Sequence, residues 1–310
     1  MKIAIMGSGG VGGFFGAKLA KVGEDVTFIA RGEHLRAIQS AGLRVKSAED
    51  GEFVVKSAAT DDPKAIGPVD LVLFCVKSYD TDAAAEAIRP MVSEDTTVLT
   101  LQNGVESAEK LARAVGSGHV LGGAAYIFAS IEAPGVITQA PPGRIVFGEL
   151  DGRETPRAQN LFHAFQRAGI SAELSTNIRR VIWEKYLFIT ALSGVTALTR
   201  CPAGIVRSLG ETRTMLKLLL EELSTLAEAS GVRLSEGAVD TAMSLVERLK
   251  ATSTSSLHHD LTHGRRLELE ALQGYAVRLG RRLSVPTPTL FAVYAALKPY
   301  EDGRPKENVI

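Results

Sequence analysis

The stretch MKIAIMGSGGVGGFFG, residues 1–16, decides the fold of this sequence. Its apolar residues 2–6 predict a buried strand, and glycines follow at once in G-x-G-x-x-G spacing. Glycine there permits a tight turn, close approach of a phosphate to the backbone, and packing of a helix on the strand. Glycine turns can also be purely structural, but here a strand precedes the turn and a helical pattern follows it. The helix N-terminus is therefore predicted to bind the diphosphate of a dinucleotide, through Gly7, Ser8, Gly9, Gly10, Val11 and Gly12.

The rest of the first half alternates apolar strand patterns with helical patterns. Further strands are predicted at 25–30, 70–76, 96–101 and 119–126, and helices near 13–22, 33–40, 80–89 and 105–115. This alternation predicts an α/β fold, a doubly wound parallel sheet with helices on both faces. Two stretches depart from it and predict hairpins: 43–57, turning at Glu49-Asp50-Gly51, and 135–150, turning at Pro141-Pro142-Gly143.

From about residue 155 the strand patterns stop and the chain is predicted to be helical. The expected helices cover 155–168, a long apolar segment from 177, 211–230, 235–250, 255–280 and 288–299. We place the domain boundary near residue 176, which gives domains 1–176 and 177–310. The final residues 301–310 are expected to form a frayed polar tail.

Composition narrows the class of protein. The chain has 310 residues, of which 45% are hydrophobic, and Lys+Arg and Asp+Glu both total 35. The chain therefore has no net positive charge that would attract nucleic acid or an anionic membrane. Cys75 and Cys201 lack disulfide or zinc spacing, and no apolar run reaches the roughly 18 residues of a membrane span. Because the apolar strand pattern starts at residue 2, we expect no cleavable leader. We expect a soluble cytoplasmic protein with a small-molecule ligand; the leucine-rich stretch 214–229 indicates either core or a homodimer face.

Arg31 follows the second predicted strand, where NAD-binding domains usually carry an acidic residue for the ribose 2′-hydroxyl. An arginine at this place suits a 2′-phosphate, so the sequence favours NADP(H). The alternative is that Arg31 is solvated and Glu33 binds the hydroxyl.

Two polar residues end predicted strands at the edge where ligands of such sheets bind. Lys77 closes DLVLFCVK and can fix a phosphate or carboxylate, and Asn103 follows TTVLTLQ and can orient a nicotinamide or a catalytic lysine. The alternatives are a lysine that enters solvent and an ordinary Asn-Gly turn.

Lys185 interrupts the apolar run IRRVIWEKYLFITALSGVTAL. Its aliphatic stem can pack while its ammonium reaches water. Alternatively, the ammonium lies in a partly dry site, where burial tunes its pKa and it donates a proton to a developing alkoxide. Spacing alone does not separate the two.

Seven short motifs in order resemble the ketopantoate reductase (2-dehydropantoate 2-reductase) family over nearly the whole chain. They are the glycine turn, the arginine at 31, V-K at Lys77, Q-N-G at Asn103, W-x-K at Lys185, S-S-x-x-x-D at Ser256 and Asp260, and R-x-x-E at Glu268 with Gly274 beyond it. The resemblance implies a Rossmann-type N-terminal domain, a helical C-terminal domain, and reduction of ketopantoate to pantoate by NADPH in pantothenate biosynthesis.

The same resemblance implies the roles of single residues. Lys185 would be the general acid, Asn103 would support the nicotinamide and that lysine, Glu268 would bond the substrate hydroxyl or the lysine, and Ser256 would bind the substrate carboxylate. Family members that make pantoate usually carry asparagines four and eight residues after the lysine, where this chain has Ile189 and Ser193. Ser193 remains a candidate substrate ligand.

These departures leave the substrate open. Ile189 and Ser193 offer fewer hydrogen bonds, and Asp80 replaces the usual glutamine after Lys77, so a less polar 2-oxo acid or another ketone is the alternative. A non-catalytic NADP(H) sensor is a second alternative, although it has no chemical reason to keep the lysine, asparagine and glutamate together. His259 and His263 have metal-ligand spacing but no HExxH glutamate, and we expect no metal.

Overall fold

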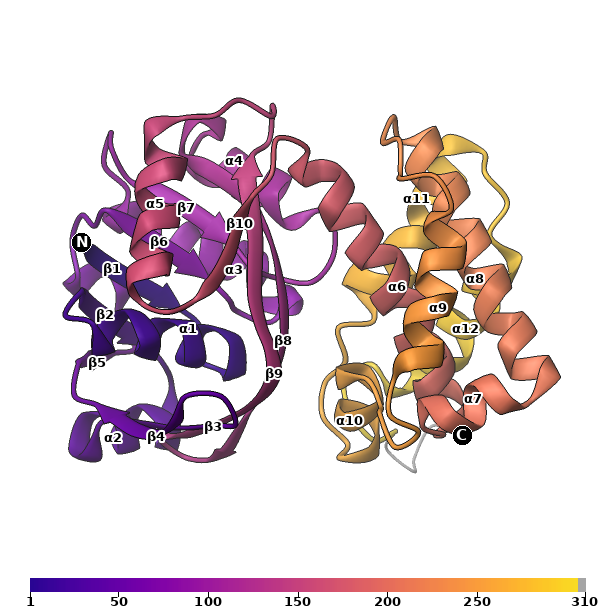
Figure 1. Cartoon of the computed structure of the whole chain (residues 1–310), viewed down its shortest axis with the longest axis horizontal. Helices are drawn as coiled ribbons and strands as arrows, with labels where there is room; N and C mark the ends of the chain where they lie inside the picture. Colours follow the sequence, from indigo (N-terminus) through magenta and orange to yellow (C-terminus); the bar gives the residue numbers. More distant parts are fainter. Residues whose placement is uncertain (306–310) are drawn as a thin grey trace. The chain divides into compact units, whose positions relative to one another are not determined.

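The computed structural model describes residues 1–305 and divides into two compact units, Met1–Val181 and a second that begins at Ile182 (Figure 1). Residues 306–310 of the predicted polar tail lie outside the described residues. The tail is not frayed at its start, because the Leu267 N–H donates to the Glu301 carbonyl at 2.8 Å.

The first unit is built on a ten-stranded sheet in the order β4-β3-β9-β8-β7-β6-β1-β2-β5, with β10 paired to β9. Neighbouring strands from β8 through β7, β6, β1 and β2 to β5 are all parallel. This confirms the doubly wound parallel plan. The strands are β1 Lys2–Met6, β2 Asp25–Ile29, β3 Leu43–Ser47, β4 Gly51–Val55, β5 Ala58–Thr60, β6 Leu71–Phe74, β7 Thr97–Thr100, β8 Val120–Ala133, β9 Val136–Glu149 and β10 Ser171–Leu174.

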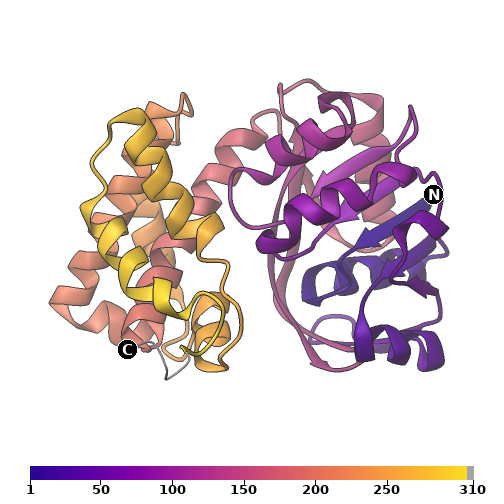
Figure 2. The ribbon, with the colours of Figure 1, turned by 180° about the vertical axis from the view of Figure 1, so that it is seen from behind.

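Helices cover both faces of this sheet, as Figures 1 and 2 show from opposite sides. Ile3 and Ile5 of β1 belong to a core with α1 (Gly10–Lys21), α2 (Gly32–Ala41) and α5 (Pro156–Arg167). Ala4 and Met6 point to a second core with α3 (Thr81–Ala87) and α4 (Ser107–Val115). Successive residues of a strand face opposite sides, so a strand buried on both sides is apolar throughout.

The predicted hairpin within 135–150 is wrong. β9 continues through Pro141-Pro142-Gly143 and pairs antiparallel with β8, and the chain turns between them at Pro134 and Gly135. Ile127 pairs with Gly143 and Phe128 with Ala140, which leaves residues 141–142 in a bulge. A bulge tolerates proline, which has no N–H for the ladder. The short strands β5 and β10 were also not predicted.

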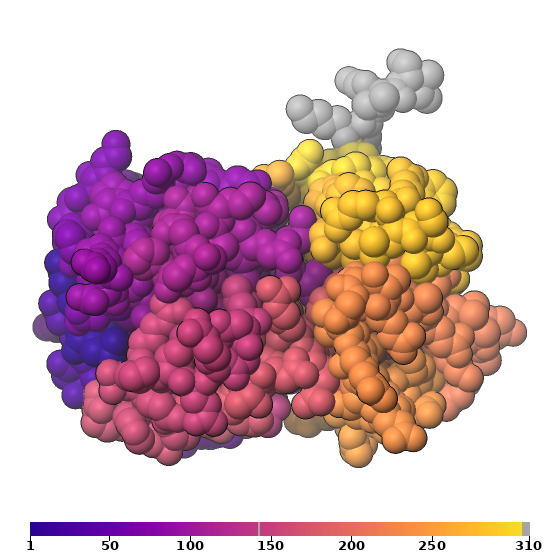
Figure 3. Space-filling model, turned by 90° about the horizontal axis from the view of Figure 1, so that it is seen from above, coloured from indigo at the N-terminus to yellow at the C-terminus, as the bar shows by residue number. Residues whose placement is uncertain are grey.

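The second unit is helical, and its helices are α6 Ile178–Thr199, α7 Ala203–Ser208, α8 Gly210–Ala229, α9 Ala238–Arg248, α10 Ser256–Thr262, α11 Tyr275–Leu283 and α12 Pro288–Leu297. Helix α6 starts within the first unit. The predicted helix 255–280 is broken, because Gly264 has a φ of +63° and a π-helical turn, η5 (Glu270–Gly274), precedes α11. Figure 3 shows the last segment of this unit, in yellow, exposed over one of its faces.

Two apolar helices of this unit are core elements. The leucines of α8 at 216, 219, 220, 223 and 226 are buried within the chain. Among the described residues α6 alone is long and apolar enough to cross a membrane by composition, but 61% of that window is buried inside the protein, as in the core helix of a globular unit.

Candidate active site

The glycine turn between β1 and α1 lies where the strand order reverses, next to the end of β6. Gly7 has a φ of +97°, and a Cβ added to it would lie 2.7 Å from the Val76 nitrogen. A Cβ on Gly12 would lie 2.2 Å from the Gly7 carbonyl oxygen, whereas one on Gly9 would meet nothing within 4 Å. The turn is thus tight at its ends and open at Gly9. With the uncapped N-terminus of α1, this geometry fits a dinucleotide diphosphate.

Ser8 is buried within the turn and tied to the end of β2. Its backbone N–H and its hydroxyl both donate to the Ile29 carbonyl, at 3.1 and 3.0 Å. Gly10 and Val11 open helix α1. All six residues predicted to bind the diphosphate therefore lie in the turn between β1 and α1 or at the start of α1.

Arg31 and Lys77 follow the carboxyl ends of β2 and β6. Arg31 is the N-cap residue of α2 and is largely exposed, and its guanidinium lies 3.5 Å from the Asp80 carboxylate. Lys77 is exposed and precedes the short turn Ser78–Asp80. Asp80, which replaces the glutamine of the family pattern, therefore lies within ion-pair distance of the arginine predicted to bind a 2′-phosphate.

Asn103 is half-buried in the segment after β7, next to a residue that sequence reasoning missed. The Gln102 side-chain amide donates to the Val76 carbonyl at 2.9 Å and to the Thr81 hydroxyl at 2.8 Å. It ties the segment that carries Asn103 to the segment after β6. The position of Gln102 next to Asn103 in Q-N-G was the feature of the sequence that could have indicated its role.

In the second unit, Lys185 lies on α6 between the buried side chains of Trp183 and Tyr186 and is itself only partly exposed. Burial lowers the pKa of Lys185 to about 8, against the opposing charge of the Glu268 carboxylate. Glu268 is 7% exposed and lies in the loop before η5, not in a helix as predicted. A lysine with this pKa gives up a proton more readily than an ordinary lysine.

The π-helical turn η5 fixes the middle of α6. The Tyr186 hydroxyl donates to the Leu272 carbonyl at 2.6 Å, and the fully buried Gln273 amide donates to the Thr190 carbonyl at 2.8 Å and to the Ser193 hydroxyl at 3.2 Å. The Ser193 hydroxyl also donates to the Thr190 carbonyl at 3.3 Å. Ser193, 3% exposed, is thus engaged within the protein. The sequence analysis did not single out Gln273. The feature that could have indicated its role is that it is a polar residue within the mostly apolar stretch LELEALQGYAV.

Ser256 is exposed at the first residue of α10. The preceding Ser255 caps this helix: its hydroxyl accepts from the His258 N–H at 3.1 Å and lies 2.9 Å from the Thr196 hydroxyl of α6. The rings of His259 and His263 lie 4.1 Å apart. Within residues 1–305 no group of three metal-binding side chains occurs.

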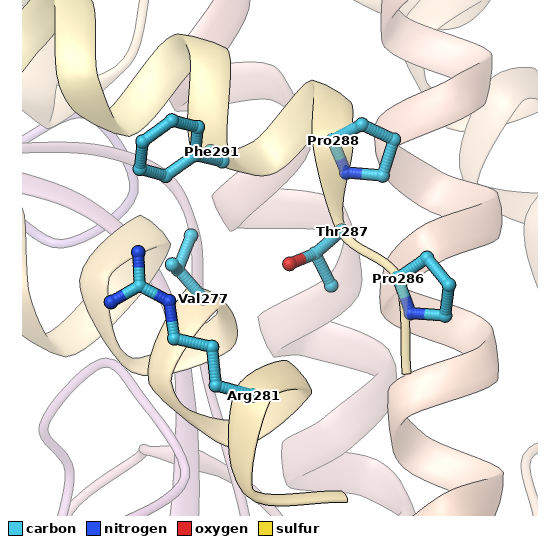
Figure 4. A pocket seen from close by; sticks show the side chains of 6 residues that line it. All are labelled: Val277, Arg281, Pro286, Thr287, Pro288 and Phe291. Carbon is cyan, nitrogen blue, oxygen red and sulfur yellow. The ribbon is translucent and has the colours of Figure 1, made fainter. Parts of the chain in front are cut away.

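A shallow surface hollow of about 370 Å³ lies between α11 and α12 (Figure 4). It is lined by Val277, Arg281, Pro286, Thr287, Pro288 and Phe291. None of these belongs to the predicted site, and the Arg281 guanidinium lies 5.6 Å from the centre of the Phe291 ring. The residues that the sequence singles out lie outside this hollow, Lys185 and Glu268 in the second unit and the glycine turn in the first.

Comparison with known proteins shows the family of this chain. Residues 3–152 match the model of the "Ketopantoate reductase PanE/ApbA" family and residues 177–301 the model of its C-terminal domain. A 2-dehydropantoate 2-reductase of Halobacterium salinarum is 32% identical over 94% of this chain and 95% of its own length.

Two solved structures share the fold. A PanE/ApbA family ketopantoate reductase of Ralstonia eutropha is 34% identical, with a TM-score of 0.90 over 97% of this chain and 98% of its own. D-mandelate dehydrogenase, solved with NADH and anilino(oxo)acetate, has the same TM-score of 0.90 over 97% and 98% of the two chains at 22% identity. The two matching family models and the full-length similarity lead to one conclusion: this chain belongs to the ketopantoate reductase PanE/ApbA family of nicotinamide-dependent oxidoreductases.

Proposed function

We propose that this chain reduces the 2-oxo group of ketopantoate to pantoate, with a hydride from NADPH and a proton from Lys185. The observation that carries the proposal is the partly buried Lys185 ammonium beside Glu268, with a pKa of about 8. A reduced ketone gains negative charge on its oxygen, and a nearby proton donor stabilises that charge. The apolar surroundings on α6 strengthen this interaction.

NADPH supplies the hydride when bound, and the protein supplies the proton. As the carbonyl carbon accepts the hydride, the Lys185 Nζ transfers a proton to the carbonyl oxygen, and the neutral amine then regains a proton from solvent. Glu268 bonds the lysine or the substrate hydroxyl, and its charge favours the ammonium form. Asn103 supports the nicotinamide and Ser256 binds the substrate carboxylate, whereas the hydroxyl of Ser193, a candidate ligand from the sequence, is bonded to Gln273 and Thr190.

We assign the cofactor to residues 1–176 and the substrate and catalytic chemistry to residues 177–310. In the first domain the glycine turn binds the diphosphate, Lys77 contacts the cofactor, and Arg31 binds the 2′-phosphate of NADP(H). An arginine pairs with phosphate through charge-assisted hydrogen bonds. Asp80, 3.5 Å from Arg31, competes with that phosphate and narrows the preference for NADPH over NADH.

We further propose a cytoplasmic enzyme of pantothenate biosynthesis. Both cysteines are free thiols rather than a disulfide, and burial raises the pKa of the Cys75 thiol, which keeps it protonated and unreactive. Unpaired cysteines are usual in a reducing compartment.

A less polar 2-oxo acid is the second candidate substrate. Ile189 presents an apolar side chain one turn after Lys185, and the Ser193 hydroxyl is already bonded to Gln273 and Thr190. A wall with few hydrogen-bonding groups does not favour the hydroxyl of ketopantoate over an alkyl or aromatic group. The fold does not select between these acids, because D-mandelate dehydrogenase shares it.

The test is NADPH oxidation by the purified protein with ketopantoate and with branched, aromatic and long-chain 2-oxo acids. We expect turnover that falls by roughly 10²–10⁴-fold in Lys185→Ala, the range of general acid catalysis. Lys217→Ala is the matched control, because Lys217 is an exposed lysine of α8 paired with Glu221.

The outcomes separate the candidates. Lysine-dependent turnover that is fastest with ketopantoate supports the proposal, and faster turnover of a less polar acid moves the same mechanism to that substrate. Binding of NADPH without turnover of any acid would instead favour either an unrelated ketone as the substrate or the non-catalytic sensor.

A further inference from the structure

His34 of α2 lies between the glycine turn and the turn that joins β8 to β9. Its Nε2 is 2.9 Å from the Ser8 carbonyl oxygen, and the Gly135 backbone N–H donates to its Nδ1 at 3.0 Å. The imidazole is half-buried. One side chain therefore bonds two backbone groups that lie 127 residues apart (135 − 8), one of them inside the predicted diphosphate site.

The bond from Gly135 fixes the roles of both ring nitrogens. A backbone N–H only donates, so Nδ1 accepts and carries no proton. The single proton of the neutral ring is then on Nε2, which donates to the Ser8 carbonyl. Burial of the ring lowers the pKa of His34, against the opposing effect of the bond to Ser8, and this favours the neutral form.

The Ser8 carbonyl belongs to the peptide group that joins Ser8 to Gly9. A trans peptide is planar, and its C=O and N–H point in opposite directions. Holding the Ser8 oxygen toward His34 therefore directs the Gly9 N–H to the other side. The Ser8 N–H, which belongs to the preceding Gly7–Ser8 peptide, is bonded to Ile29, so the peptides on both sides of Ser8 are held within the protein. A Cβ on Gly9 would meet nothing within 4 Å, so Gly9 borders open space.

Gly135, the other partner of His34, lies in a turn that packs closely against helix α2. A Cβ on Gly135 would lie 2.9 Å from the Ala37 Cβ of α2, and a Cβ on Gly10 would lie 2.2 Å from the Ala129 carbonyl oxygen of β8. The β8–β9 pair thus packs closely against both α2 and the start of α1. This packing holds the imidazole in the orientation that the Ser8 bond requires.

We infer that His34 is a positioning residue for the cofactor, which fixes the Ser8–Gly9 peptide so that the Gly9 N–H is presented to the diphosphate. This inference rests on the proposed binding of NADPH at the glycine turn. His34 acts through Ser8 and Gly9 rather than by touching the cofactor. The glycines leave space for the phosphates, and His34 orients the Gly9 N–H that donates to them.

Two substitutions separate this role from simple support of the β8–β9 turn. In His34→Gln the longer amide reaches Ser8 and keeps a donor at the place of Nε2, and in His34→Asn the shorter amide keeps an acceptor for Gly135 but does not reach Ser8. We expect the NADPH dissociation constant, measured by fluorescence titration, to stay within ~3-fold of the original in His34→Gln. In His34→Asn it should rise about tenfold, the effect of one buried hydrogen bond.

Three further measurements make the test decisive. At saturating NADPH, kcat and the KM for the 2-oxo acid should change less than about twofold in His34→Asn, because only cofactor binding is affected. Thermal midpoints without cofactor are recorded for both variants. His119→Asn is the matched control, since His119 is also half-buried in the first unit and lies 2.9 Å from the Thr96 carbonyl, and it should leave NADPH affinity unchanged.

Equal NADPH affinity in His34→Asn and the original protein would overturn the inference, as would losses in both variants that follow their thermal midpoints. If the original protein binds no NADPH, the proposed cofactor fails and the inference fails with it. If the original protein binds and only His34→Asn is weakened, both stand.

Discussion

Arg31 decides between the two nicotinamide dinucleotides in the proposed function. We expect Arg31→Ala to weaken NADPH binding by roughly 10- to 100-fold, the effect of losing a charge-assisted hydrogen bond, and to leave NADH binding within ~3-fold. Asp80→Asn should instead strengthen NADPH binding, because it removes the carboxylate 3.5 Å from the guanidinium. Fluorescence titrations with both dinucleotides measure these changes, and Arg36→Ala on the same helix is the control. An equal loss for NADH and NADPH would show that Arg31 does not bind the 2′-phosphate.

Lys185 sets the expected pH dependence of the reaction. Only the ammonium form donates a proton, and its pKa in the folded protein is lowered to about 8. We therefore expect kcat/KM for reduction to be level below pH 8 and to fall tenfold per pH unit above it. Lys185→Ala should lose this limb along with most of its activity. A rate that rises through pH 8 would mean that the neutral amine is the active form.

Residues differ in how far the sequence alone reveals them. Lys185 is conspicuous as a charge within an apolar run, and the glycines of the turn stand beside one another in the chain. Gln273 and His34 are not conspicuous, because their meaning depends on partners 83 and 101 residues away, Thr190 and Gly135. A pattern of residues adjacent in sequence does not reveal a hydrogen bond between residues that are far apart in the chain.

At the scale of elements, the longer strands and helices followed from local periodicity, but the short elements β5, β10 and α7 and the interruptions did not. The single helix predicted over 255–280 contains a loop and a π-helical turn, and that loop is what carries Glu268. The Pro141-Pro142 pair predicted a turn and instead forms a bulge within β9. In both places a bond to another part of the chain outweighs the local preference: β9 pairs with β8 on both sides of the bulge, and Leu267 in the loop bonds to Glu301.

The turn η5 is joined to α11 and α12 through Glu270. Its carboxylate accepts from the Tyr294 hydroxyl at 2.6 Å and from the Lys298 ammonium at 2.5 Å, and it also pairs with Arg278. Burial raises the pKa of Glu270, but these hydrogen bonds outweigh burial and lower it to about 2. Because the folded pKa is below the ordinary value of 4.5, the carboxylate stabilises the fold at neutral pH, and this contribution is lost as the pH falls from about 4.5 to 2.

We therefore expect Glu270→Gln to lower the free energy of unfolding at pH 7, with a difference that shrinks below about pH 4. Urea unfolding followed by the fluorescence of Trp183, the one tryptophan in the sequence, measures this in the second unit. Glu221→Gln is the control, because its pair with Lys217 is exposed on α8. A difference that stays constant from pH 7 to 3 would show that the Glu270 charge is not the cause. The carboxyl is more than a third exposed, so solvent screens this contribution.

At the scale of the whole molecule, the order of elements along the chain was enough to predict the α/β plan, because helices close in sequence join β1 to β2, β6 to β7 and β7 to β8. The outer part of the sheet was not predictable in the same way. β3 pairs with β9, whose residues come about 90 positions later (137 − 45 = 92 for Val45 and Ile137), and no local pattern fixes that partnership. The candidate site depends on this part too, since the β8–β9 turn supports His34.

The division into two units predicts that cofactor affinity and proton donation respond to different substitutions. The residues proposed to bind NADPH belong to the first unit, whereas Lys185, Glu268 and Ser256 belong to the second. Substitutions at sites without shared partners usually act independently to within about 0.5 kcal/mol, or roughly twofold in a binding constant. We expect Glu268→Gln and Ser256→Ala to lower kcat/KM for the 2-oxo acid by more than ~10-fold, as loss of a hydrogen bond that involves a charged group does, and to leave the NADPH dissociation constant within ~2-fold.

Conversely, Arg31→Ala should raise the NADPH dissociation constant without moving the pH midpoint set by Lys185. Parallel titrations and initial rates on the same preparations measure both quantities, and a shift of the pH midpoint in Arg31→Ala would mean that the arginine influences the catalytic lysine directly.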